Sequence, residues 1–147
     1  MIVYTGGTFD LFHYGHVNFL EKCADIAGDD GKVIVAVNTD EFVQKYKKKR
    51  PVMDLNERCL ALIGCAWVDD VVINESGADS KPTIIRVKPD VVAISSDWAR
   101  RDYYKQMQFT QDWLDVREIT LAYIPHTPDI SSTDIRSRLR RHGEEVS

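Results

Sequence analysis

Cysteine is scarce in this sequence, and the three cysteines present suit neither a metal site nor a disulfide framework. Cys23, Cys59 and Cys65 form no Cys-x-x-Cys pair, which is the spacing typical of zinc sites and of thioredoxin-like redox motifs. Their number is odd, and the chain opens with a strand-like segment instead of a signal peptide. These features predict a cytoplasmic protein in a reducing compartment.

Long apolar runs and an excess of positive charge are absent as well. No apolar run approaches the roughly 20 residues that a membrane-spanning helix needs, so we expect no membrane partner. The formal net charge is −4, which argues against a nucleic-acid partner, although the basic run at residues 45–50 suits the phosphates of a small ligand. With 147 residues, 44% of them hydrophobic, the chain can bury the core of one domain.

Linkers, internal repeats and low-complexity tracts are also missing, so the sequence predicts one domain over residues 1–141 and a loose polar tail over 142–147. Apolar runs alternate with segments of helical period, which is typical of α/β proteins with crossover helices. We therefore expect a doubly wound, Rossmann-like, five-stranded parallel sheet with its ligand beyond the carboxyl ends of the strands. The expected strands lie near residues 2–4, 32–38, 70–73, 90–94 and 118–124. The expected helices lie near residues 15–27, 41–46, 56–65, 80–87, 103–116 and 131–140.

The most informative stretch is residues 6–16, which read Gly-Gly-Thr-Phe-Asp-Leu-Phe-His-Tyr-Gly-His. It lies between an apolar strand and a helix, and its glycines let backbone N–H groups approach a ligand at the positive end of the helix dipole. A strand, turn and helix in this order form an anion site. His13 and His16, with Gly15 between them, can each donate a hydrogen bond to a phosphate oxygen.

Two other interpretations of this stretch stay open from the residues alone. A His-x-x-His pair also suits a metal site, but the remaining histidines, His126 and His142, lie far along the chain, and no further ligands stand at a convincing spacing. A purely structural turn would explain the glycines but not the two histidines beside them.

A second candidate segment lies near the other end of the chain. Ser131, Ser132 and Thr133 place three hydroxyls at the expected entry of a helix. They can cap that helix, or they can bind a phosphate together with its free N–H groups.

The stretch at residues 6–16 resembles the HxGH signature of the nucleotidylyltransferase superfamily, and its wider form is similar to that of the cytidylyltransferases. Residues 35–42, Val-Ala-Val-Asn-Thr-Asp-Glu-Phe, extend the resemblance to glycerol-3-phosphate cytidylyltransferases. The resemblance implies catalytic roles for His13, His16 and Lys47. It implies nucleotide contacts from Gly7, Thr8, Phe9, His13, His16, Lys49, Arg58, Asp97, His126, Thr127, Ile130, Ser131, Ser132 and Thr133. It implies acceptor contacts from Asp10, Lys47 and Lys81.

The chain departs from the family pattern at several positions. The closing motif Arg-Thr-x-Gly-Ile-Ser-Thr-Thr corresponds to residues 126–133, where His126 replaces the arginine and Asp129 replaces the glycine. Arginine is permanently charged whereas histidine is neutral at neutral pH, so this change concerns the grip on the outer phosphates. Ala66 stands where relatives carry arginine, and Gly-Asp-Asp-Trp appears as residues 95–98, Ser-Ser-Asp-Trp, whose Asp97 and Trp98 are expected to border the nucleotide.

The resemblance implies transfer of a cytidylyl group from CTP to a small phosphorylated alcohol, with glycerol 3-phosphate preferred, which gives a CDP-alcohol and pyrophosphate. The attacking phosphate oxygen is already anionic, so the protein must align the reactants and stabilise growing charge. Mg²⁺, bound mainly through substrate phosphates and not through protein side chains, is the expected cofactor. The resemblance also implies a homodimer.

Two alternatives to this function remain. Residues 49–52, Lys-Arg-Pro-Val, are similar to a segment of heptose-phosphate adenylyltransferases, which would make the substrates ATP and a sugar phosphate. The second alternative is a noncatalytic nucleotide-binding relative that lost the arginines but kept the fold. The intact histidine pair argues against it.

Overall fold

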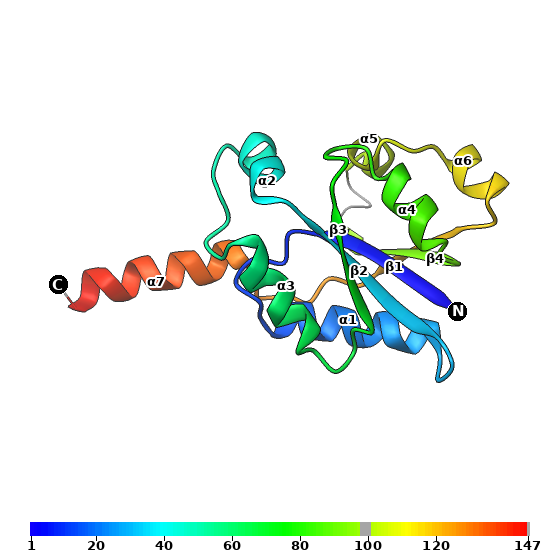
Figure 1. Ribbon diagram of the computed structural model, residues 1–147. Helices are drawn as coiled ribbons and strands as arrows, with labels where there is room; N and C mark the ends of the chain where they lie inside the picture. The colour runs from blue at the N-terminus through cyan, green and yellow to red at the C-terminus, as the bar shows by residue number, and fades with distance from the viewer. Residues whose placement is uncertain (98–100, 147) are drawn as a thin grey trace.

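The computed structural model describes residues 1–97 and 101–146 and shows one twisted sheet with helices on both faces (Figure 1). In chain order its elements are β1 (Ile2–Gly7), α1 (Tyr14–Ala27), β2 (Lys32–Asn38), α2 (Asp40–Lys47), α3 (Leu55–Ile63), β3 (Asp70–Asn74), α4 (Lys81–Val87), β4 (Val91–Ser95), α5 (Tyr103–Met107), α6 (Gln111–Val116), β5 (Thr120–Ile124) and α7 (Ser132–Val146). The five strands match the expected ones to within two residues at most ends, so the fold class predicted from the sequence is confirmed.

The sheet is entirely parallel, with strand order β3-β2-β1-β4-β5. The chain builds outward from β1 to β3, then crosses back to place β4 on the other side of β1. The strand order therefore reverses between β1 and β4, which is where a doubly wound sheet opens a crevice for its ligand. The glycine turn after β1 lies at this point.

Each face of the sheet carries its own core because side chains alternate along a strand. Val3 faces the side covered by α1 and α3, where Leu20 and Leu62 pack. Tyr4, the next residue, faces the side covered by α4, α5 and α6, where Ile84 and Leu114 pack. Figure 1 shows these two helical layers on opposite sides of the sheet.

Two helical segments differ from the sequence prediction. The helix expected over 103–116 is broken into α5 and α6, because Gln108 adopts a left-handed conformation with φ 63° and ends α5 by donating its backbone N–H to Tyr104. The last helix is longer than expected. α7 continues through His142 to Val146, where a loose tail was predicted, and Figure 1 shows this end extending away from the body of the protein.

In the described residues, no helix is both long enough and apolar enough to cross a membrane.

Candidate active site

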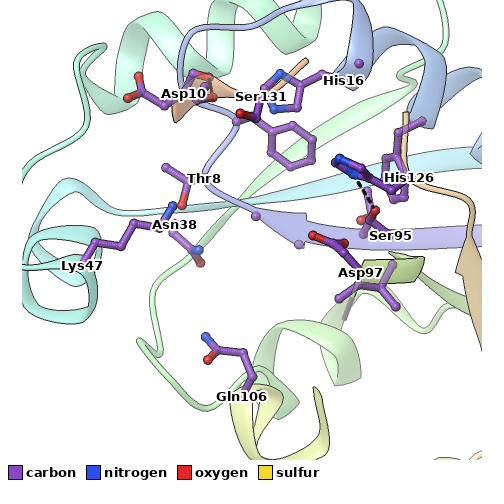
Figure 2. Close-up of a pocket in the computed structure, with 18 of the residues that line it drawn as sticks. Thr8, Asp10, His16, Asn38, Lys47, Ser95, Asp97, Gln106, His126 and Ser131 are labelled. Atoms are coloured by element: carbon purple, nitrogen blue, oxygen red, sulfur yellow. Dashed lines mark hydrogen bonds between the residues drawn. The ribbon is translucent and has the colours of Figure 1, made fainter. Parts of the chain in front are cut away.

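A cavity of about 440 Å³ opens at the carboxyl ends of the strands, on both sides of the β1–β4 reversal. Its walls come from the loop after β1, the last residues of β2, β3 and β4, the segment after β5, and the first turn of α7. Figure 2 shows how these segments place Thr8 and Lys47 on one side, and Asp97 and His126 on the other. The cavity therefore collects side chains from segments that are widely separated in the sequence.

The loop after β1 has an unusual backbone. Phe9 and Leu11 both have positive φ, 54° and 51°, a conformation that costs an ordinary L residue free energy. At Gly7, an added Cβ would lie 2.9 Å from the ring of Phe9, so a larger residue there would displace that ring. The glycine is thus required for the close packing of the loop beneath the cavity.

His13 and His16 form a capping box at the N-terminus of α1. His13 is the N-cap residue, and its Nδ1 accepts a hydrogen bond from the backbone N–H of Gly15 at 3.1 Å. The Nδ1 of His16 accepts from the backbone N–H of His13 at 3.2 Å, and the two rings stack with centroids 3.8 Å apart. Since a neutral imidazole carries one proton, this network assigns the proton to Nε2 in both rings. Each ring keeps one Nε2–H donor for a ligand.

Both histidines are held neutral. Burial, together with the neighbouring His13, lowers the pKa of His16 to about 3, although the Asp10 carboxylate opposes the shift. Burial and the nearby His126 also lower the pKa of His13 below its usual value. At neutral pH the pair therefore acts as two hydrogen-bond donors to anionic oxygens and not as a pair of cations.

Asp10 joins three segments around the loop. Its carboxylate accepts hydrogen bonds from the backbone N–H groups of Val52 (2.8 Å) and Met53 (2.9 Å) and pairs with Arg136 at 3.2 Å. Burial alone would raise the pKa of Asp10, but these backbone donors and Arg136 outweigh it and lower that pKa. Asp10 lines the cavity, and its two carboxylate oxygens also hold the 52–53 loop and α7, so its acceptor contact stays a prediction.

The nucleotide contact predicted for Arg58 needs correction. The side chain of Arg58 is fully buried (0% exposed) and does not line the cavity. The guanidinium donates to the carbonyls of Met53, Thr8 and Asn38 and pairs with Asp40 at 2.6 Å. The predicted nucleotide contact is not possible in this conformation, because the guanidinium is fully buried outside the cavity and its donors are taken by these carbonyls and Asp40. Arg58 instead holds the main chain of two residues that line the cavity, Thr8 and Asn38.

The three lysines implied by the resemblance are placed differently. Lys47, at the end of α2, lines the cavity, and partial burial there and the proximity of Arg136 lower its pKa, which Asp10 partly offsets. Lys49 does not line the cavity. Lys81 does not line it either, and instead pairs with Asp79 at 2.9 Å and donates to the carbonyl of Gln108.

The segment that leads into the first turn of α7 forms a further part of the cavity wall. Ile130, Ser131, Ser132 and Thr133 all line the cavity, and two of the hydroxyls also make hydrogen bonds within the protein. Ser131 accepts from the backbone N–H of Asp134 at 3.0 Å, and Ser132 donates to the carbonyl of Asp10 at 2.6 Å. Capping and cavity lining are thus combined in one turn.

His126 and Thr127 lie on the same wall and have defined partners. The Nδ1 of His126 lies 3.4 Å from the hydroxyl of Ser95, and its backbone N–H donates to Ser96 at 3.0 Å. Thr127 accepts a hydrogen bond from the side chain of Asn18 at 2.9 Å. His126 and the segment Ser95–Ser96 both depart from the family pattern, and these two departures are in contact with each other.

Asp97, Gly7, Thr8 and Phe9 also line the cavity, whereas Trp98 lies outside the described residues. Among the described residues, no group of three or more His, Cys, Asp or Glu side chains is placed to hold a metal ion.

Sequence reasoning missed several residues of the cavity wall. Asn38 and Asn74 lie at the ends of β2 and β3, and Tyr46 and Gln106 come from α2 and α5. Arg136, from α7, lines the cavity too, and the sequence already made it the alternative to His126 as the cation at the outer phosphates. The only available signal was the position of the two asparagines at the carboxyl ends of expected strands.

Comparison with known proteins places the chain among enzymes with this architecture. The FAD synthase of Korarchaeum cryptofilum (strain OPF8) is 34% identical over 138 residues, which cover 93% of this chain and 90% of that protein. The glycerol-3-phosphate cytidylyltransferase of Bacillus subtilis (strain 168) is 33% identical over 137 residues, which cover 93% of this chain and 95% of that protein. The FAD synthase of Pyrococcus abyssi (strain GE5 / Orsay) is 41% identical over 95 residues, and that match covers 65% of this chain and 62% of the relative.

Among solved structures, the lipopolysaccharide core biosynthesis protein from Thermoplasma volcanium GSS1 superposes with a TM-score of 0.63 at 25% identity, covering 86% of this chain and 96% of that one. The Cytidylyltransferase-like family matches residues 4–138. That match includes both the histidine pair and the serine turn that closes the cavity. The chain belongs to the Cytidylyltransferase-like family of nucleotidyltransferases.

Proposed function

We propose that the protein transfers a cytidylyl group from CTP to glycerol 3-phosphate or a similarly small phosphorylated alcohol, releasing pyrophosphate. The observation that carries this proposal is the cavity at the strand reversal, where two neutral imidazole donors and a lysine face the same space. Neutral donors together with the cationic side chains that line the cavity, Lys47 and Arg136 among them, suit the phosphorus centre of a transferring nucleotidyl group, where negative charge grows in the transition state. The family membership supports the same class of reaction.

The proposed reaction needs alignment more than it needs a base. A phosphate oxygen of the acceptor attacks the α-phosphorus, the bond to the β-phosphate oxygen breaks, and pyrophosphate leaves with the electron pair. The Nε2–H groups of His13 and His16 donate to oxygens on the α-phosphate, and the ammonium of Lys47 holds the acceptor phosphate in line. The turn at residues 131–133 holds the outer phosphates.

Mg²⁺ is the cofactor we propose, and it would supply charge neutralisation for the departing pyrophosphate. The lining residues fit an ion held mainly by substrate oxygens, because the described residues offer no cluster of three ligands. Two carboxylates line the cavity among the described residues; Asp10 already has hydrogen-bond partners, which leaves Asp97 to contribute an oxygen. The homodimer implied by the resemblance is part of the proposal, and light scattering at assay concentration tests it.

A small acceptor is supported by the B. subtilis glycerol-3-phosphate cytidylyltransferase, which the chain matches over 95% of that protein's length.

A second candidate is adenylyl transfer from ATP to a flavin phosphate, which would give FAD. The FAD synthase of K. cryptofilum, matched over 90% of its length, favours it. The two candidates share the chemistry at the α-phosphorus but differ in both substrates, so one assay separates them.

The test measures pyrophosphate release for each of four nucleoside triphosphates with glycerol 3-phosphate, FMN, phosphocholine and a heptose phosphate. We expect the highest kcat/KM with CTP and glycerol 3-phosphate, and a product with the mass of CDP-glycerol. A higher kcat/KM with ATP and FMN, or with any other pair, contradicts the proposed substrates. Nucleotide binding by calorimetry without turnover of any pair would instead show a noncatalytic binding protein.

A further inference from the structure

A chain of side-chain hydrogen bonds runs from α4 to the cavity wall. The hydroxyl of Thr83 donates to the Oδ1 of Asn74 at 3.2 Å, and the Nδ2 of Asn74 donates to the carbonyl of Gly77 at 3.0 Å and to the Oδ1 of Asn38 at 3.1 Å. Asn74 and Thr83 are buried, 7% and 3% exposed. A backbone carbonyl only accepts hydrogen bonds, so Gly77 decides which end of the Asn74 amide is Nδ2. The amide of Asn74 is therefore fixed in one orientation.

The fixed amide of Asn74 determines the orientation of Asn38. Because the Oδ1 of Asn38 accepts from Asn74, its Nδ2 is directed away from that contact, and the hydrogen bonds found among the described residues include none from this nitrogen. Asn38 lines the cavity, and Figure 2 shows it between Thr8 and Lys47. Its main chain is also held, since its carbonyl accepts from Arg58 at 2.9 Å. Two N–H donors are thus preorganised at the cavity wall.

The position of Asn38 favours one of the two substrates. Asp97, Ser95 and His126 lie on the β4 and β5 side of the strand reversal, whereas Asn38 and Lys47 lie on the β2 and α2 side (Figure 2). A neutral pair of N–H donors beside an ammonium matches a phosphate oxygen or a hydroxyl, because both accept hydrogen bonds. Lys47 is the residue to which the proposed function assigns the acceptor phosphate, so Asn38 lies on the acceptor side of the cavity.

We propose that Asn38 binds an oxygen of the phosphorylated acceptor, and that Asn74 and Thr83 are positioning residues that hold its amide in the binding orientation. This inference rests on the proposed function in that it takes the cavity to hold an acceptor beside the nucleotide. It assigns acceptor recognition to the carboxyl ends of β2 and β3. If the asparagines only joined β2 to β3, their substitution would affect the KM values of both substrates alike. The experiment therefore compares the KM of the acceptor with the KM of the nucleotide.

The main variant is Asn38→Asp, which is the same size and keeps the oxygen that accepts from Asn74. It replaces the two donors with a negative oxygen facing the acceptor. With glycerol 3-phosphate and CTP, we expect the KM for glycerol 3-phosphate to rise at least tenfold while the KM for CTP changes less than twofold. Thermal melting verifies that the variant folds, and Asn38→Ala, which removes the donors without adding charge, is the second variant.

The positioning role is tested without altering Asn38. Asn74→Asp cannot donate to the Oδ1 of Asn38, so the Asn38 amide should rotate and present oxygen to the cavity. We expect a rise in acceptor KM close to that of Asn38→Asp, and less than a further twofold rise in the double variant. Thr83→Ser keeps the hydroxyl and should retain wild-type KM values. Asn56→Asp makes the same chemical change at an exposed position of α3 outside the cavity and should leave the acceptor KM unchanged.

The outcomes separate this inference from the proposed function. If glycerol 3-phosphate reacts but Asn38→Asp leaves its KM unchanged, or raises only the KM for CTP, the inference is wrong and the proposed function stands. If FMN or another acceptor is the one that reacts, the proposed substrate is wrong, and the same KM comparison with that acceptor decides the inference. If no acceptor reacts and wild-type protein does not bind glycerol 3-phosphate by calorimetry, both are contradicted.

Discussion

The two ring nitrogens of His16 have different roles, a helix cap at Nδ1 and a hydrogen-bond donor at Nε2, and substitutions can separate them. Nδ1 accepts from the backbone N–H of His13 at 3.2 Å and completes the cap of α1, while Nε2–H remains for the substrate. His16→Asn keeps a polar atom near the Nδ1 position and deletes the donor at Nε2. His16→Gln places an amide near the Nε2 position and deletes the capping acceptor. The pair of variants therefore distinguishes the catalytic donor from the cap.

The magnitudes follow from these two contacts. A donor to charge that grows in the transition state is worth about 3 kcal/mol, so His16→Asn should lower kcat roughly a hundredfold, with little change in nucleotide KM. Loss of a helix cap costs about 1 kcal/mol, so His16→Gln should lower Tm by about 3 °C for a chain of this size, and should retain more of kcat than His16→Asn does.

The low pKa of His16 adds a dependence of stability on pH. In the folded protein burial lowers this pKa to about 3, whereas in the unfolded chain it is about 6.5. Below pH 6.5 the unfolded state binds a proton that the folded state does not, so the free energy of unfolding falls as the pH decreases towards 3. Between pH 7.5 and pH 5 this loss amounts to about 2 kcal/mol.

Urea unfolding at pH 7.5 and pH 5 measures this loss, and the rate of pyrophosphate release measures kcat. We expect the wild-type protein to lose about 2 kcal/mol more than His16→Asn between the two pH values, since the variant has no imidazole at this position. Equal losses in both proteins would show that His16 is not held neutral by burial. A kcat for His16→Asn within threefold of wild type would show that Nε2–H does not act in the transition state.

Three further predictions concern the surroundings of the cavity. Arg58→Met removes the buried partner of Asp40 and should lower the free energy of unfolding by about 3 kcal/mol, measured in urea; a raised nucleotide KM with unchanged stability would mean that Arg58 contacts the nucleotide. Gly15→Ala would bring a Cβ to 2.9 Å from the Cε1 of His13, and the displaced ring should lower kcat by roughly tenfold or more, whereas an unaltered kcat would show that the ring position is not critical. His126→Arg adds a permanent charge at the family's arginine position and should tighten nucleotide binding at pH 8 in calorimetry; unchanged affinity would mean that another cation, such as Arg136, holds the outer phosphates.

Most of the fold could be predicted because the central strands β1, β2 and β4 are largely buried, which makes them apolar runs in the sequence, whereas the edge strands β3 and β5 keep exposed residues. Val33, Val35, Ala36 and Val37 in β2 are all fully buried. The break between α5 and α6 could not be predicted in the same way. Gln108 has no intrinsic preference for a left-handed conformation, and it is the burial of Phe109 beside Tyr103 and Tyr104 that ends the helix there.

The candidate site was predictable where neighbours in sequence make the contacts. His13, Gly15 and His16 lie within one helical turn, so their spacing alone indicates a capped helix start with two imidazoles. Arg58 shows the opposite case. Its match to a family position suggested a nucleotide contact, but the carbonyls that hold it belong to Thr8 and Asn38, 50 and 20 residues away.

The sequence by itself determined the parallel α/β architecture, the glycine-containing turn and the histidine pair, because burial patterns, glycine turns and helix caps act over a few residues. Only the tertiary structure decided which polar side chains line the cavity. Asn38 and Asn74 meet because β2 and β3 pair in parallel with these two residues in register, and Asp10 is occupied because a loop more than 40 residues later folds over it. Such contacts depend on strand order and loop packing, which are set by the whole core and are not encoded in any local pattern.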